Sequence, residues 1–172
     1  AGTAITTGDS NIAIGWEALK TEDTHGNNIA IGASALATQN AGADAYNVGI
    51  GYNAGTAVTT GTKNTIIGGL AGDALTTGIV NVAVGYQALS SDTAGKRSVA
   101  IGNGALFTQN FTSATDTYNT AVGEAAGNQV TTGIQNTLIG GLAGDALTDA
   151  DFNVAMGYAA LSADTLGSNS TA

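Results

Sequence analysis

Hydrophobic and polar positions along the chain follow one short pattern that repeats nine times. The unit reads Asn-x-small-aliphatic-Gly-x-x-Ala, so apolar side chains alternate over a few residues before a glycine. Its first residues are Asn11, Asn28, Asn47, Asn64, Asn81, Ser98, Asn119, Asn136 and Asn153, separated by 17, 19, 17, 17, 17, 21, 17 and 17 residues. Self-similarity at a nearly fixed period is the signature of a repeat protein.

Each unit predicts one coil of a parallel β-solenoid. The alternation in Asn11–Gly15, with its β-branched residues, predicts a short strand, and the glycine permits a turn. We expect a second, weaker strand in the next few residues and then a polar corner. No segment keeps a helical period over three turns. The sequence therefore predicts an all-β solenoid of nine coils of about 17 residues.

The repeat also divides the chain. Residues 11–172 form a single repetitive β-solenoid domain in this interpretation. Residues 1–10 (AGTAITTGDS) align with residues 54–63 (AGTAVTTGTK), so we expect them to belong to a preceding coil.

A finer pattern predicts how the coils are filled. Eight positions after the leading residue stands either Leu (19, 36, 89, 106, 161) or Gly (55, 72, 127, 144). Three positions after each Gly comes an aliphatic residue: Val58, Leu75, Val130 or Leu147. Three positions after each Leu comes a polar residue: Glu22, Gln39, Asp92, Gln109 or Asp164. We infer a four-coil super-repeat and a narrow lumen with room for one large aliphatic side chain in each coil.

Both faces of the predicted strand are apolar. Ile, Val or Thr lies on one face, and Ala, Gly, Ile66 or Leu138 lies on the other. A solenoid covers only the face turned to its lumen, so the other needs a partner. We expect a homotrimer that uses the face with Ile66 and Leu138; the alternative is a monomer thick enough to bury both faces. For the aromatic residues after the motif glycine we expect packing between subunits, with ligand binding as the alternative: Trp16, Tyr52, Tyr86 and Tyr158.

Composition restricts the kinds of partner that the chain can bind. The formal net charge of −9 disfavours nucleic acid and anionic membranes. No segment approaches the roughly 20 apolar residues of a membrane span, so we expect no membrane insertion. The chain has no Cys and only three Phe, one Trp and one Met, and a core must therefore rely on small residues in thin layers.

The sequence offers few residues suited to catalysis or metal binding. His25 is the only histidine and falls in a polar corner, where we expect a solvated side chain. No pair of carboxylates recurs at one place. The segment Gly68–Leu75 partly resembles the repeat of a calcium-binding β-roll, but we expect it to form a structural turn. We therefore expect no enzyme, no cofactor and no metal. The Asn column predicts a ladder of hydrogen bonds between coils.

Two insertions, in the second and sixth coils, are the candidates for recognition, because loops on a rigid scaffold often bind partners. Their candidate binding residues are Gln39, Asn40, Asp44, Tyr46, Phe107, Gln109, Asn110, Phe111, Asp116 and Tyr118. We expect Phe111 to be exposed beside amides and to stack on a sugar ring. Equally, the two loops could cover a seam between chains.

The unit Asn81–Leu89 (NVAVGYQAL) resembles the head repeats of trimeric autotransporter adhesins (YadA-like heads). It is still more similar to the Asn-Thr-Ala-x-Gly-Tyr-x-Ala-Leu arrays of bacteriophage tail fibres. The resemblance extends over essentially the whole chain, although the adhesin unit is shorter. It implies a left-handed β-roll of three parallel chains that serves in attachment, located on a virion tail fibre or a bacterial surface.

The expected function is therefore a structural and adhesive fibre segment that presents a surface to a host receptor or a carbohydrate. One alternative is a pure spacer or a filament-forming repeat without binding activity. Another is ice binding, for which rows of threonine are suited. Thr pairs such as Thr76-Thr77 occur at only some corners of the stack, however.

Overall fold

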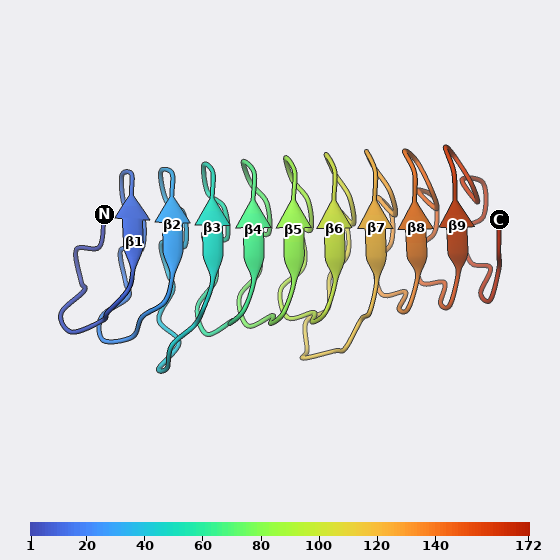
Figure 1. The fold of residues 1–172 in the computed structure, drawn as a ribbon. Helices are drawn as coiled ribbons and strands as arrows, with labels where there is room; N and C mark the ends of the chain where they lie inside the picture. The colour runs from blue at the N-terminus through green and yellow to red at the C-terminus, as the bar shows by residue number, and fades with distance from the viewer.

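The computed structural model describes all of residues 1–172 and shows nine coils stacked along one axis (Figure 1). Each coil supplies one strand of three residues. The strands are β1 (Ile12–Ile14), β2 (Ile29–Ile31), β3 (Val48–Ile50), β4 (Thr65–Ile67), β5 (Val82–Val84), β6 (Val99–Ile101), β7 (Thr120–Val122), β8 (Thr137–Ile139) and β9 (Val154–Met156). They form one parallel sheet in chain order, so the predicted all-β solenoid is confirmed. The chain has no helix that could cross a membrane.

The strands pair at equivalent positions of the repeat. Ile12 lies opposite Ile29, for example, and Val99 opposite Thr120. The extra residues of the second and sixth coils are accommodated outside the sheet, in the β2–β3 and β6–β7 connections, which reach farther from the stack than the other corners (Figure 1). Register along the sheet is therefore preserved across coils of different length.

The pattern of contacts extends past both ends of the nine strands. Near the N-terminus, the backbone N–H of Gly2 donates to the carbonyl of Ala18 at 2.8 Å, and Ile5 packs against the core. After β9, Thr171 pairs in parallel with Val154. These segments adopt the same inter-coil contacts as the full coils.

The second strand that we expected in each coil is absent, and that prediction is wrong. Turns follow each β-strand instead. The positions six and eight residues after the leading residue take positive φ, as in Glu17 (55°) and Leu19 (49°), and this left-handed backbone cannot continue a strand. Adjacent coils are still hydrogen-bonded there, for example from the N–H of Leu36 to the carbonyl of Ala54 at 3.0 Å.

The motif glycine brings the backbones of adjacent coils into close contact. Its φ ranges from 125° to 141° over the nine coils, which side chains rarely tolerate. In the first eight coils an added Cβ would also lie 2.3–2.6 Å from the backbone of the next glycine in the column. Both restrictions explain why this position is Gly in every repeat.

The lumen is filled partly as predicted. The aliphatic residues expected there, including Leu89 and Leu75, are fully buried from coil one to coil eight. However, Ile66 and Leu138 also point into the lumen and are 0% exposed, so their predicted position at an interface between chains is wrong. They occupy the space beside the glycines at the eighth position: a Cβ on Gly127 would lie 2.8 Å from Leu138 Cδ1. Coils four and eight therefore hold two large aliphatic side chains, not one.

The expected Asn ladder is confirmed. The N–H of Asn64 donates to Oδ1 of Asn47 at 2.9 Å, while its own Nδ2 donates to the carbonyl of Gly78 at 2.9 Å. Similar bonds connect most other coils, and these asparagines are buried from coil two onward. The ladder thus satisfies backbone groups at a buried corner, where an unpaired group would be costly.

Substitution of the motif glycine tests the close backbone contact. We expect Gly68→Ala to lower the free energy of unfolding by about 2–4 kcal/mol, because the new Cβ meets the carbonyl of Gly85 at a strained φ. Its neighbour Gly69 is a matched control, since a Cβ there meets only the Tyr86 ring at 3.5 Å. Urea unfolding of Gly68→Ala and Gly69→Ala measures both effects, and equal losses would contradict the explanation.

A second pair of variants tests the lumen assignment. We expect Leu138→Ala to cost about 2–5 kcal/mol, because it leaves a cavity among fully buried side chains. Thr137→Ala, one residue earlier on the outward side of β8, should cost less than half as much. A Leu138→Ala protein as stable as Thr137→Ala would place Leu138 outside the core.

Candidate binding surface

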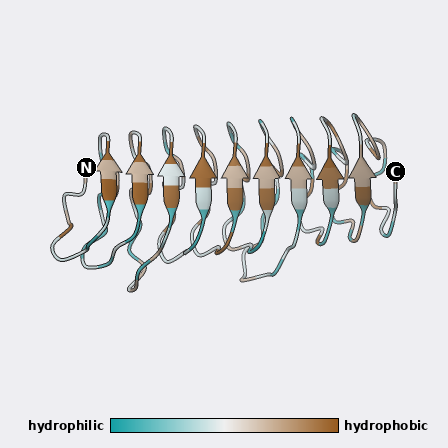
Figure 2. Ribbon diagram, viewed as in Figure 1, coloured by the Kyte–Doolittle hydropathy of each residue, from teal (hydrophilic) through white to brown (hydrophobic).

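The outward face of the sheet is a mostly apolar surface that carries no charge. The first and third residues of each strand point away from the lumen, and they comprise fifteen aliphatic or methionine side chains and three threonines, with no charged residue. Figure 2 shows most of the strands in brown and much of the connecting chain in teal or white. At the two ends of the stack Ile14 and Met156 are 59% and 65% exposed. We call these eighteen residues the sheet face.

The aromatic residues that follow the motif glycine border the sheet face. Trp16, Tyr52, Tyr86 and Tyr158 are all more than half exposed. Two of the rings lie over a glycine of the preceding coil, because a Cβ on Gly69 would be 3.5 Å from Tyr86 and one on Gly141 would be 3.5 Å from Tyr158. The rings therefore extend the apolar surface beyond the end of the strands.

The two inserted loops place the ten predicted binding residues in different environments. Asp44, Tyr46, Asn110, Asp116 and Tyr118 are exposed, and Asn40 and Phe107 are partly exposed. Three others are buried: Gln39, Gln109 and Phe111.

For those three residues, the prediction of an exposed binding side chain is wrong. Phe111 is only 8% exposed, because the loop folds back on coil five, where its N–H donates to Asp92 and its carbonyl accepts from Ala94 at 2.8 Å. Gln39 and Gln109 point into the lumen. A polar residue at that position could be recognised as internal only from the hydrogen bonds that it makes.

The exposed residues of the coil-six loop form a small cluster with coil five. Arg97 pairs with the carboxylate of Asp116, and its guanidinium lies 5.6 Å from the centre of the Tyr118 ring. In the equivalent loop of coil two, Asp44 instead accepts from the N–H of Gly26 at 2.9 Å. Asp44 and Asp116 therefore anchor their loops, and Tyr46 and Tyr118 remain the exposed aromatic groups.

Behind the coil-six loop, the lumen contains a buried polar network. Nε2 of Gln109 donates to Oδ2 of Asp92 at 2.6 Å and to Oγ of Ser98 at 2.8 Å, while its Oε1 accepts from Asn119 at 2.8 Å. Gln109 thus bridges the one place where serine interrupts the Asn ladder. Gly95 leaves room for the carboxylate, since a Cβ there would lie 2.1 Å from Asp92 Oδ2.

The carboxylate of Asp92 has a raised pKa. Burial away from water is the main cause, and the hydrogen bonds from Gln109 and from the backbone N–H groups of Phe111 and Gly95 offset it in part. The group therefore serves as a structural acceptor within the wall of the stack.

The corresponding place in coils one and two holds the only group of potential metal ligands. Glu22, Asp23 and His25 place ligand atoms within 4.8 Å of one another. Oxygens of Glu22 and Asp23 already accept backbone N–H groups at 3.2 and 2.7 Å. Oε2 of Glu22 and Nε2 of Gln39 have no hydrogen-bond partner. Glu22 and Gln39 occupy the same repeat position as Asp92 and Gln109, whose carboxylate and amide are hydrogen-bonded to each other. The geometry thus resembles a second lumen network more than a metal centre.

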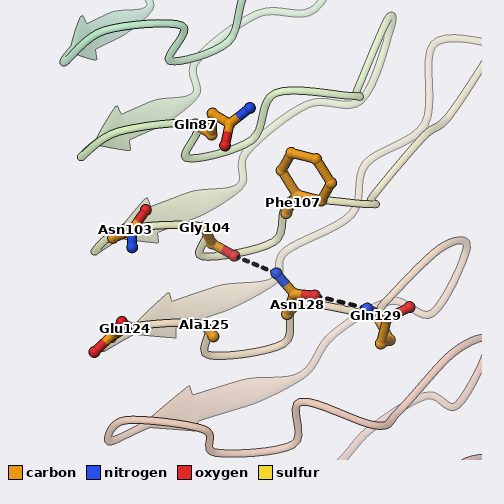
Figure 3. Close-up of a pocket in the computed structure, with 8 residues that line it drawn as sticks. All are labelled: Gln87, Asn103, Gly104, Phe107, Glu124, Ala125, Asn128 and Gln129. Carbon is orange, nitrogen blue, oxygen red and sulfur yellow. Dashed lines mark hydrogen bonds between the residues drawn. The ribbon is translucent and has the colours of Figure 1, made fainter.

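A hollow that the sequence did not reveal lies beside the carboxyl ends of β5–β7. It has a volume of about 270 Å³. Its walls are formed by Gln87, Asn103, Gly104, Phe107, Glu124, Ala125, Asn128 and Gln129 (Figure 3). Only Phe107 was among the predicted residues. Its neighbours across the hollow belong to other coils, and the sequence pattern could not show how they meet.

Comparison of the chain with protein-family models, with curated proteins and with solved structures finds no match. The class that the fold defines is that of a parallel β-solenoid repeat protein.

The raised pKa of Asp92 predicts a pH effect on stability. Because the folded pKa lies above the ordinary value of 3.8, the folded state binds more protons between the two values. The contribution of Asp92 to the free energy of unfolding therefore falls as the pH rises through that window and stays unfavourable at neutral pH. We expect wild-type protein to gain stability relative to Asp92→Asn when the pH is lowered from about 7 to about 4.

Urea midpoints across this range measure the difference between the two proteins. Asp149→Asn, at an exposed corner, controls for the loss of one negative charge. If the urea midpoints of wild-type protein and Asp92→Asn changed in parallel with pH, the predicted effect of Asp92 would be contradicted.

Proposed function

We propose that this chain is a structural and adhesive segment of an extracellular or virion fibre, in which three parallel copies associate through their sheet faces. The observation that carries the proposal is the sheet face itself. It continues over nine strands, or roughly 40 Å at the spacing of adjacent strands, without a charged side chain. Soluble monomers rarely expose continuous apolar patches beyond a few hundred square ångströms.

Charge and periodicity favour a second copy of the same chain as the partner. The chain has a formal net charge of −9, so copies repel one another over most of their surface, but the sheet face adds nothing to that repulsion. Each copy also repeats its apolar residues at the same spacing, and parallel copies can therefore match coil by coil. The likeness of the repeats to trimeric adhesin heads favours three copies over two.

The attachment part of the proposal concerns the surface that the assembled fibre would present. Tyr46 and Tyr118 are 55% and 52% exposed on the two protruding loops, and Asn40 and Asn110 offer amides close by in the sequence. Exposed aromatic rings with polar neighbours suit a receptor or a glycan. The anchors at Asp44 and Asp116 would limit the entropy lost when such a partner binds.

Assembly is tested by the mass of the protein in solution. We expect sedimentation equilibrium at micromolar concentration to give three times the 16.7 kDa of one chain. The double variant Ile101→Lys/Ile139→Lys places two cations on the sheet face and should shift the protein to monomers or to unfolded chains. The matched control, Thr77→Lys/Thr132→Lys, adds the same charge at exposed corners and should remain trimeric.

A folded wild-type monomer at micromolar concentration would overturn the proposed assembly. So would a lysine pair on the sheet face that left the trimer mass unchanged.

A further inference from the structure

The hollow beside β5–β7 is a departure from an otherwise regular wall. In every coil the sixth position after the leading residue has a φ of 53–63°, and in eight of nine coils it has a side chain. Only coil six has a glycine there, Gly104. The same coil has Asn103 at the fifth position, and Phe107 is the only aromatic residue at the ninth position of any coil. Three local changes therefore combine to open a cavity and place a ring at its edge.

The cavity wall is polar and partly held in place. Nδ2 of Asn128 donates to the carbonyl of Gly104 at 3.1 Å, and its Oδ1 accepts from Nε2 of Gln129 at 2.7 Å (Figure 3). The side-chain amides of Gln87 and Asn103 and the side-chain carboxylate of Glu124 make no hydrogen bond within the chain. Donors and acceptors are thus available from three successive coils around one aromatic side chain.

The chemistry of this wall selects one class of ligand. No Lys, Arg or His borders the cavity, and the only charged group is the Glu124 carboxylate, so anionic groups are disfavoured. Planar amides and a carboxylate match the hydroxyl groups of a sugar, and the partly exposed face of Phe107 suits its C–H groups. A volume of about 270 Å³ limits the ligand to about one sugar residue.

We propose that the cavity formed by Gln87, Asn103, Gly104, Phe107, Glu124 and Asn128 binds one uncharged sugar residue of a glycan. The site deepens the attachment part of the proposed function, on which it rests, and does not require the sheet faces to associate. It lies at the ends of the strands, away from the centre of the sheet face.

The super-repeat itself supplies a variant that fills the cavity in a backbone conformation that leucine already adopts in other coils. Leu70 and Leu142 occupy the position of Gly104 in coils four and eight, with φ of 58° and 59° against 63° for Gly104. Gly104→Leu should therefore fold, since its Cβ meets only the flexible end of Asn128 at 3.3 Å. Ala159→Leu makes the same kind of change in coil nine, outside the cavity, and is the matched control.

Saturation-transfer NMR with the methyl glycosides of glucose, galactose, mannose and N-acetylglucosamine tests the site, with glucuronic acid as the charged counterpart. We expect at least one neutral glycoside to bind with a dissociation constant in the millimolar range and glucuronic acid to give no signal. Affinity should fall roughly tenfold or more in both Gly104→Leu and Phe107→Ala and stay unchanged in Ala159→Leu.

The absence of any neutral glycoside signal from wild-type protein would overturn the proposed site, as would binding that Gly104→Leu leaves unchanged. Sedimentation of the same samples separates this result from the assembly. A trimer without glycoside binding refutes only the site. If glycoside binding persists in Gly104→Leu, attachment stands but occurs elsewhere on the chain.

Discussion

Contact between the backbones of successive coils at the motif glycine is the constraint on which the rest of this structure depends. At this point no side chain separates adjacent coils, and a Cβ would lie 2.3–2.6 Å from the neighbouring backbone. The sheet pairs, the Asn ladder and the lumen residues all repeat in register because every coil returns to this same contact. Insertions are accommodated only at corners that lie away from it.

Much of the fold could be predicted because the repeat is regular, and the errors fall where regularity is broken or concealed. The glycine column and the period-two alternation at Asn11–Gly15 identified the strands and their parallel order. The same alternation could not show which apolar face is internal. The side-chain volumes explain the observed orientation: Ile66 and Leu138 fill the space left by glycines at the eighth position, and the first and third residues of each strand lie outside.

The candidate site was predicted less well than the fold. Phe111 and Gln109 looked exposed because they lie in an insertion and are polar or isolated from other apolar residues. The backbone of the loop folds back onto coil five, and Gln109 completes a network with Asp92. The polar position of both residues recurs in the sequence, but the recurrence does not show that it faces the lumen. The glycine at Gly104 was visible in the sequence, but its significance depends on knowing which positions of three successive coils surround one cavity.

The arrangement of the lumen has a consequence for how such a chain can change length during evolution. Side chains of neighbouring coils interlock: the space for Leu36 is provided by Gly49 and Gly55 of the next coil, and Ile66 lies against Gly55 and Gly72. Removing coil three would bring Leu36 towards Ile66, and removing coil four would leave the space beside Gly55 unfilled. Removing residues 47–118, which make up four coils, would instead join Tyr46 to Asn119 and bring matching surfaces together. Chains of this kind should therefore grow or shorten in whole super-repeats.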